Sequence, residues 1–208
     1  MTRNEDLYQA VLHGKRDETE AAVVAAIEAG ASIDDLLQDS MVPAMRQMGE
    51  DFESGEAFIP EMLLAARAMD AALSKLQPLL EQHGKEPCGH VAIGTVRGDL
   101  HDIGKNLVAM MMRGGGYKVV DLGVDCSVES YLAAAADGAQ AVCLSALLTT
   151  TMPLMKDVVD AMAQQHPEVR VMIGGAPITR GYADSIGAHG YADTAGGVVP
   201  ELERLLAT

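Results

Sequence analysis

Aromatic residues are scarce in this chain: they make up 3% of its 208 residues and include no tryptophan and only two phenylalanines. Hydrophobic residues still reach 49% and charged residues 22%, a composition typical of globular proteins and not of disordered chains. Alanine and the 13 methionines must therefore fill much of the core. The length suffices for one large domain or two small ones.

Long apolar runs and an excess of basic residues are lacking as well. The apolar stretches end well short of the ~18–20 residues of a membrane span, and residues 1–6 (MTRNED) contain no apolar signal segment. We therefore expect a cytoplasmic protein with no membrane partner. The formal net charge of −15 would repel phosphates, so we also expect no nucleic-acid partner.

The chain contains only three cysteines, Cys88, Cys126 and Cys143, and no C-x-x-C pair. An odd number without this spacing argues against a disulfide framework and against a thiolate zinc site. We expect three reduced thiols.

Residues 1–86 have the pattern of a helical domain. From Asn4 to about Gln82 the apolar residues keep helical spacing, and no stretch alternates like a strand. One apolar stripe consists of Met41, Met45, Met48 and Phe52, and a second of Met62, Ala66, Met69, Leu73 and Leu76. This pattern predicts an N-terminal bundle of about four helices.

Residues 87–208 alternate short apolar runs with helical segments. Expected strands cover residues 91–96, 118–122, 141–145 and 169–173, with a weaker fifth at 189–192, and expected helices lie near 102–113, 128–137, 152–165 and 198–206. Continuous apolar strands alternating with helices predict a parallel sheet covered on both faces. We therefore expect a flavodoxin-like or Rossmann-like, doubly wound α/β domain with a five-stranded parallel sheet.

Such sheets bind ligands beyond the carboxyl ends of their strands, at the point where the strand order reverses. Residues 97–104 follow the first expected strand, residues 145–151 the third, and residues 174–177 the fourth. In the strand order 2-1-3-4-5 the first and third strands are neighbours. The loops 97–104 and 145–151 would then face each other.

The loop 97–104 contains a possible metal ligand. Asp99 and His101 are two residues apart, so the carboxylate can accept a hydrogen bond from one imidazole nitrogen and leave the other free for a metal. Gly98 and Gly104 allow the backbone to bend tightly and approach a bulky ligand. A solvated histidine beside a helix-capping aspartate explains the same spacing, so this motif alone leaves both interpretations open.

Two other ligand-binding loops fit this position poorly. No G-x-G-x-x-G or Walker pattern follows the first strand, and Asp99 and Asp102 stand where an anion would bind. A phosphoacceptor receiver domain would need an aspartate after the third strand and a lysine after the fifth. Ser145 occupies the first of these places, and no lysine follows Lys156.

The motif Asp99-x-His101-x-x-Gly104, followed by Ser145-x-Leu147 and Gly174-Gly175, resembles the three-part signature of cobalamin-binding domains. Residues 98–106 (GDLHDIGKN) look like this loop in the methyl-carrying branch, and residues 48–62 (MGEDFESGEAFIPEM) look like its helical cap domain. The resemblance covers nearly the whole chain. Without a catalytic barrel, the chain is similar to the stand-alone corrinoid proteins of methylamine, methanol, betaine or methoxyl methyltransferase systems, and less like a complete methionine synthase.

The resemblance implies a role for each matching residue. His101 would replace the cofactor's own base as lower ligand of the cobalt, Asp99 would bind its other ring nitrogen, and Thr151 would complete the relay where serine is common. Further implied contacts to the corrinoid are Gly98, Asp102, Ile103, Gly104, Ser145, Leu147, Thr149, Gly174 and Gly175 in the α/β domain, and Phe52, Phe58, Ile59 and Met62 in the cap. Local backbone hydrogen bonding explains Ser145 and Thr149 equally simply, and bundle packing explains the cap residues.

The implied function is that of a methyl carrier. Its partners would be a substrate-specific corrinoid methyltransferase, an acceptor methyltransferase that serves tetrahydrofolate or a thiol, and a reductive activation protein. His101 would leave the reduced cobalt and return to the methylated cobalt, while the cap moves about a linker at residues 84–89. The alternatives are a cobalamin-dependent sensor, which usually adds a DNA-binding segment, and a radical mutase subunit, which needs no methyl-protecting cap.

Overall fold

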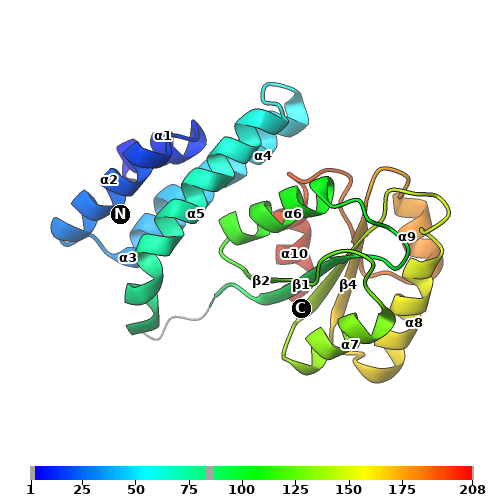
Figure 1. Ribbon diagram of the computed structural model, residues 1–208. Coiled ribbons are helices and arrows are strands. Elements are labelled where there is room, and N and C mark those ends of the chain that lie inside the picture. Colours follow the sequence, from blue (N-terminus) through cyan, green and yellow to red (C-terminus); the bar gives the residue numbers. More distant parts are fainter. Residues whose placement is uncertain (1–2, 83–86, 208) are drawn as a thin grey trace. The chain divides into compact units, whose positions relative to one another are not determined.

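The computed structural model describes residues 3–82 and 87–207, and it contains two compact units (Figure 1). One unit is helical and the other is built on a β-sheet. The expected domain junction at residues 86/87 and half of the expected linker 84–89 lie outside the described residues. The division of the chain at that point therefore stays a prediction.

The helical unit consists of four helical segments, which confirms the number expected from the apolar stripes. They are α1 (Glu5–Leu12), α2 (Arg16–Glu28), a continuous segment formed by α3 (Ile33–Asp35), the π-helix η1 (Leu36–Met41) and α4 (Val42–Ser54), and α5 (Ile59–Gln82). Gly55 ends α4 in a left-handed conformation with φ 81°, which a residue without a Cβ adopts without strain. The buried stripe residues include Met41, Met45, Met48, Met62, Met69 and Leu76.

The second unit contains a five-stranded, all-parallel sheet in the order β2-β1-β3-β4-β5. Its strands are β1 (His90–Thr95), β2 (Lys118–Asp121), β3 (Ala141–Ser145), β4 (Arg170–Gly174) and β5 (Gly190–Tyr191). This order is that of a doubly wound sheet and confirms the expected fold class. None of the helices over residues 3–82 and 87–207 combines the length and apolarity that crossing a membrane would require.

Helices cover both faces of the sheet. They are α6 (Ile103–Gly114), α7 (Val128–Ala136), α8 (Leu154–Gln165), α9 (Arg180–Ile186) and α10 (Val198–Leu206). Helices α7, α8 and α9 lie on one face, and α6 and α10 lie on the other (Figure 1). Helix α9 was not among the expected helices. It has only seven residues. Thr179 caps its N-terminus, where the side chain accepts the Tyr182 N–H, and the left-handed Gly187 follows its last residue.

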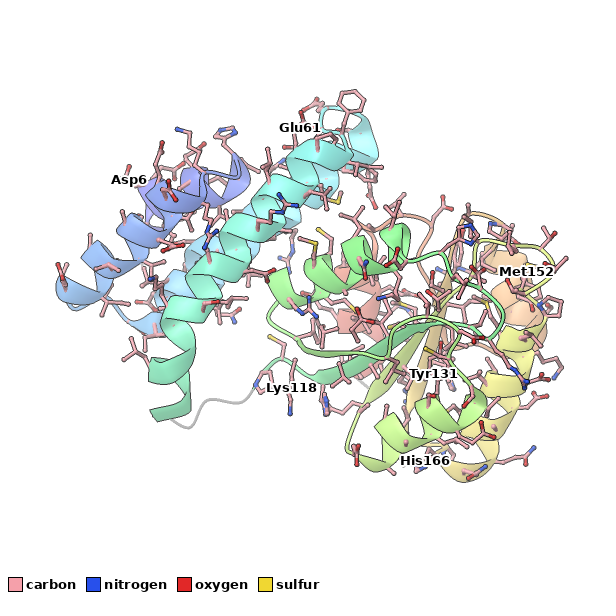
Figure 2. All side chains as sticks on the ribbon, in the orientation of Figure 1. Asp6, Glu61, Lys118, Tyr131, Met152 and His166 are labelled. Carbon is pink, nitrogen blue, oxygen red and sulfur yellow. The ribbon has the colours of Figure 1, made fainter. Side chains whose placement is uncertain are left out.

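Small and sulfur-containing side chains dominate the core, as the scarcity of aromatic residues requires. Tyr131 of α7 is fully buried between its helix and the sheet, where it packs with alanines, valines and methionines (Figure 2). Cys126 and Cys143 are buried and Cys88 is exposed, and all three are free thiols. This confirms the expectation that the cysteines are not paired.

Candidate functional site

The site lies where β1 and β3 run side by side at the reversal of strand order. The two strands pair in parallel from Val91 with Ala141 to Thr95 with Ser145. The Val96 N–H then donates to the Ser145 carbonyl at 3.0 Å, so the segments that follow β1 and β3 leave the sheet at the same level. The loops 97–104 and 145–151 therefore face each other, as the strand order predicts.

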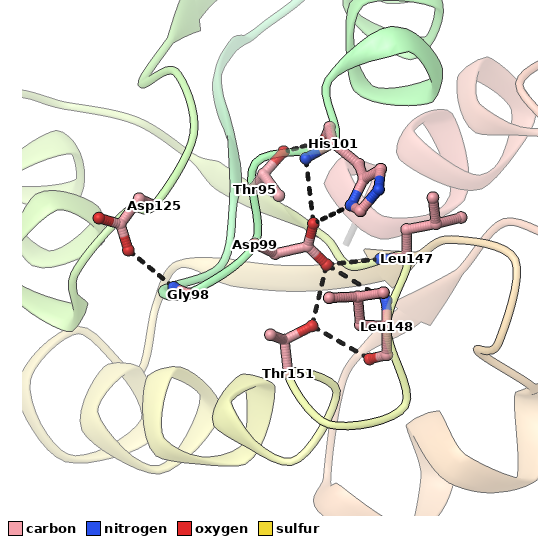
Figure 3. A network of polar contacts seen from close by, with 8 residues as sticks. All are labelled: Thr95, Gly98, Asp99, His101, Asp125, Leu147, Leu148 and Thr151. Carbon is pink, nitrogen blue, oxygen red and sulfur yellow. Dashed lines mark hydrogen bonds and ion pairs between the residues drawn. The ribbon is translucent and has the colours of Figure 1, made fainter.

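Asp99 joins these two loops through both of its carboxylate oxygens (Figure 3). Its Oδ1 accepts the backbone N–H of His101 at 3.0 Å and lies 2.7 Å from His101 Nδ1. Its Oδ2 accepts the backbone N–H groups of Leu147 at 2.8 Å and Leu148 at 3.3 Å and lies 2.9 Å from Thr151 Oγ1. The residue is fully buried, so these donors replace the water that an exposed carboxylate would bind.

The hydrogen bonds of Asp99 also fix its charge. Burial by itself raises the pKa of this carboxyl, because it disfavours the charged form. The hydrogen bonds from Leu147, from the backbone and ring of His101 and from Thr151 outweigh burial, and they hold the pKa of Asp99 well below its usual range. Asp99 is therefore a carboxylate at neutral pH.

An ionised Asp99 determines which nitrogen of His101 can bind a metal. A carboxylate only accepts hydrogen bonds, so the short contact to Nδ1 requires the proton to be on that nitrogen. The lone pair of the neutral imidazole then lies on Nε2. The His101 side chain is 51% exposed, and Nε2 is the ring nitrogen left for a ligand.

Large apolar side chains stand exposed on the same two loops. Leu100 is 71% exposed and Ile103 76% exposed beside His101, and Leu147 and Leu148 are exposed on the opposite loop. Exposed apolar residues in such a group mark a surface that another molecule covers. A half-exposed imidazole among apolar side chains suits a flat, largely apolar ligand with a metal at its centre.

Thr151 occupies the buried end of this network. Its Oγ1 lies 2.9 Å from Asp99 Oδ2 and 3.0 Å from the Leu148 carbonyl, so its single proton can be donated to either acceptor. Its methyl carbon would be 3.6 Å from a Cβ built on Gly98, an ordinary contact distance. The methyl group that distinguishes threonine from serine is therefore accommodated.

The Thr151 hydroxyl can be tested without any cofactor. We expect Thr151→Val, which keeps the shape but removes the hydroxyl, to lower the free energy of unfolding by about 1–2 kcal/mol, because a buried carboxylate loses a donor. Thr151→Ser keeps the donor and should stay within about 0.5–1 kcal/mol of wild type, since one methyl contact is lost. Urea unfolding of the three proteins at neutral pH measures the difference. Equal stability of the Val variant and wild type would contradict the assignment.

The remaining residues expected in the loop 97–104 have identifiable local roles. Gly98 adopts a left-handed φ of 78°, and Gly104 has open space where a Cβ would stand. Asp102 precedes α6, where its carboxylate accepts the Asn106 amide at 3.1 Å. Ile103 begins that helix with its side chain exposed. These residues lie on the same edge of the sheet as His101.

The expected residues at the ends of β3 and β4 and in the loops that follow differ in burial and in the space around them. Ser145 is half-buried at the end of β3, and Thr149 is exposed in the following loop. A Cβ on Gly174 would lie 3.2 Å from the Ala192 carbonyl oxygen. On Gly175 it would lie 1.9 Å from the Ala146 carbonyl oxygen, so that glycine is required by the packing of two backbone segments.

The four residues expected to contact the cofactor from the cap are not equivalent. Phe58 is 66% exposed and Ile59 45% exposed at the start of α5, where Glu61 accepts the Phe58 N–H at 3.1 Å. Phe52 is half-buried on α4. Met62 is fully buried, and bundle packing accounts for it.

Sequence reasoning missed two polar residues that shape the loop 97–104. The buried Thr95 donates its hydroxyl to the His101 carbonyl at 2.9 Å, and Asp125 accepts the Gly98 N–H at 2.7 Å (Figure 3). Asp125 lies in the loop after β2, the strand that borders β1. Asp125 follows the end of a strand next to the point where the strand order reverses, and this position could have indicated that it belongs to the site.

Fold and site together define a class: an α/β protein whose single, carboxylate-held imidazole lies at the carboxyl edge of a doubly wound sheet. Two family models, both described as B12 binding domain, match the chain over residues 89–202 and 3–77. The chain belongs to this B12-binding family. Its cofactor is a cobalamin-type corrinoid.

Relatives and solved structures agree with this assignment. The chain is 34% identical to a corrinoid protein of Desulfitobacterium hafniense (strain Y51), with 99% of this chain and 98% of the relative covered. It is 37% identical to dimethylamine corrinoid protein 1 of Methanosarcina acetivorans, with 98% and 97% covered. A cobalamin-binding protein from Desulfitobacterium hafniense DCB-2 superimposes with a TM-score of 0.80 at 28% identity, covering 97% of both chains.

The chain is also similar to part of a methyltransferase complex. It superimposes on a chain of the methanol:cobalamin methyltransferase complex from Methanosarcina barkeri with a TM-score of 0.84 at 29% identity. The match covers 97% of this chain and 78% of that one. The helical unit and the sheet unit thus have counterparts within single related chains.

The residues present fit a corrinoid. A corrinoid would bring most of the cobalt ligands itself, so one imidazole nitrogen is what the protein would need to provide. Asp99 leaves that nitrogen, Nε2, with its lone pair, and the exposed Leu100, Ile103 and Leu147 offer apolar contact to a macrocycle. Tautomer, exposure and surroundings of His101 all suit this ligand.

Proposed function

We propose that this chain is a methyl carrier that binds its corrinoid with the lower base displaced and His101 as the cobalt ligand. It would serve a substrate-specific corrinoid methyltransferase and an acceptor methyltransferase for tetrahydrofolate or a thiol, with a reductive activation protein as a further partner. The observation that carries this proposal is the buried Asp99, which fixes the proton on Nδ1 and leaves Nε2 of a half-exposed His101 for the metal.

The names of the relatives support one of the proposed partners, the substrate-specific methyltransferase. Relatives at 37–40% identity include dimethylamine and trimethylamine corrinoid proteins, and a structural relative is part of a methanol:cobalamin methyltransferase complex. A chain of this kind works by docking on a methyltransferase. The donor would be chosen by that partner enzyme.

The chain's own residues would control when His101 is available. When bound, a corrinoid supplies a cobalt that accepts a methyl group in its reduced state and gives it up to an acceptor. His101 would hold the metal through Nε2 while Asp99 accepts the Nδ1 hydrogen bond. If His101 were released from the metal, Asp99, 2.7 Å from Nδ1, would keep the ring oriented for its return.

The apolar residues would protect the reactive face from water. Leu100 and Ile103 surround His101 on the α/β unit, and Phe58 and Ile59 form an exposed apolar pair on the helical unit. Apolar cover lowers the local polarity and excludes competing nucleophiles. We propose that Leu100 and Ile103 contact the ring from the α/β unit.

Spectroscopy of the loaded protein tests the ligand. Apo protein is loaded with hydroxocobalamin and reduced to the cob(II)alamin state, whose EPR spectrum reports the axial nitrogen. Labelling with ¹⁵N-histidine should change the nitrogen splitting in wild type and in the control His13→Ala, whose exposed histidine lies on the helical unit. We expect His101→Ala to lose this label-dependent splitting. Its persistence in His101→Ala would refute the ligand assignment.

A turnover measurement separates a carrier from the other classes. The reduced, loaded protein should take up a methyl group from methyl iodide and release it to a thiol when a partner methyltransferase is added. A sensor would not turn over methyl groups, and a mutase subunit would require the adenosyl form. Stable methylation without any enzyme-dependent release would contradict the carrier function.

A further inference from the structure

The exposed Asp125, in the loop between β2 and α7, has no role in the proposed function as described so far. We propose that Asp125 is a positioning residue for the cobalt ligand. It would hold the Gly98–Asp99 segment so that the Asp99 carboxylate reaches His101 and the loop 147–151 at the same time. This inference rests on the proposed function only where it concerns the metal.

Asp125 brackets one short segment with two hydrogen bonds. Its carboxylate Oδ1 accepts the Gly98 N–H at 2.7 Å, and its own backbone N–H donates to the Asp99 carbonyl at 3.0 Å. Both ends of the Gly98–Asp99 dipeptide are thus held by the same residue. Figure 3 shows this contact on the side of the loop away from the His101 ring, so Asp125 acts on His101 through Asp99.

The backbone conformation of Asp125 argues that its carboxylate is needed there. With φ 54°, it is the one residue other than glycine in the described part of the chain with a positive φ. Aspartate tolerates this region better than most side chains, but glycine would occupy it without strain. A residue that keeps this strained backbone conformation and makes a 2.7 Å side-chain contact is consistent with selection for the contact.

The frame that carries Asp125 is itself anchored to β1. The Thr95 N–H donates to the Gly123 carbonyl at 3.0 Å, and the Cys126 N–H donates to the Thr95 carbonyl at 2.9 Å. Val96 and Cys126 form a parallel β-bridge. The loop around Asp125 thereby extends the β1–β2 pairing beyond both strand ends, and Asp125 lies on a rigid support.

The Oδ2 atom of Asp99 is also held by hydrogen bonds, so the position of the Asp99 backbone matters. Leu147, Leu148 and Thr151 present their donors to Oδ2 from the loop after β3. Oδ1 must meet the two nitrogens of His101 at the same time. A rotation of the Gly98–Asp99 peptide would move the carboxylate away from one of these groups. The contact that yields first would be the one to the exposed His101 side chain.

A matched pair of variants separates the carboxylate from the backbone. Asp125→Gly removes the acceptor while relieving the strained conformation, and Asp125→Asn keeps an acceptor oxygen and tolerates the same conformation. Histidine ¹⁵N shifts of the cofactor-free protein, measured where His101 is neutral, report the ratio of its tautomers. We expect Asp125→Gly to lower the ratio of Nδ1–H to Nε2–H by about three- to tenfold, the effect of one hydrogen bond. Asp125→Asn should retain the wild-type ratio.

Loading with cob(II)alamin adds the metal readout. The fraction of protein with histidine nitrogen splitting should fall in Asp125→Gly and recover in Asp125→Asn. A urea midpoint near that of wild type establishes that the Gly variant folds, and Asp125→Ser, whose shorter hydroxyl does not reach Gly98, provides a second variant. Wild-type tautomer ratios in both Asp125→Gly and Asp125→Ser would overturn the inference. Loss of histidine splitting in wild type itself would instead refute the proposed function and leave the tautomer result standing.

Discussion

Asp99→Asn is expected to lower the free energy of unfolding by about 2–4 kcal/mol, even without cofactor, because it breaks a buried hydrogen-bond network. The carboxylate receives donors on both oxygens: His101 on Oδ1, and Leu147, Leu148 and Thr151 on Oδ2. An amide has one acceptor oxygen, so its NH₂ group must face donors on one of the two loops. Urea unfolding measures the loss, with the exposed Asp102→Asn as the control.

The same variant has a predictable pH dependence. The pKa of Asp99 is lowered in the folded state, so its ionisation contributes stability that is present above the unfolded pKa of about 4 and is lost as the pH falls toward the folded value. The difference in stability between wild type and Asp99→Asn should be fully present at pH 7 and should narrow steadily below about pH 4. If the free energies of unfolding of wild type and Asp99→Asn differed by the same amount at pH 3 and pH 7, Asp99 would not be stabilised as a carboxylate.

The fold could be predicted because its signals are periodic and repeated. Apolar stripes at helical spacing defined the bundle, and alternating strands and helices defined the parallel sheet. The rule for strand-order reversal then brought Asp99 and Ser145 to the same edge. The two helices that the periodicity did not reveal are short or irregular. Helix α9 has few apolar residues in its seven positions. The π-helix η1 has the same apolar spacing as the α-helices beside it.

The site was predictable only in part, for a related reason. The Asp99–His101 contact joins residues two apart, so the sequence alone indicated it. The Thr151 contact joins residues 52 apart and came from the family resemblance. Asp125 contacts Gly98 across 27 residues through a left-handed backbone, and no local propensity specifies such a pairing. Met62 is fully buried, and its contact with the cofactor, which came from the family resemblance, stays a prediction.

Gly175→Ala is expected to be the most destabilising substitution at the sheet edge, with a loss of more than about 3 kcal/mol. The new Cβ would lie 1.9 Å from the Ala146 carbonyl oxygen and 2.9 Å from its carbon, and φ 129° is a conformation that alanine rarely adopts. Ala146 cannot move away freely, because it pairs with Gly174 and precedes Leu147, which donates to Asp99. Urea unfolding of the cofactor-free protein gives the loss.

Gly181→Ala supplies the matched control for that substitution. Gly181 lies in α9 with nothing within 4 Å of an added Cβ, so alanine should be neutral or stabilise by up to about 1 kcal/mol. The comparison also decides why Gly175 is a glycine. If it only leaves room for the cofactor's tail, Gly175→Ala should fold as stably as Gly181→Ala and fail only in binding. Destabilisation of the cofactor-free protein, together with an altered His101 tautomer ratio, would show that Gly175 acts through Ala146 and Leu147 on Asp99.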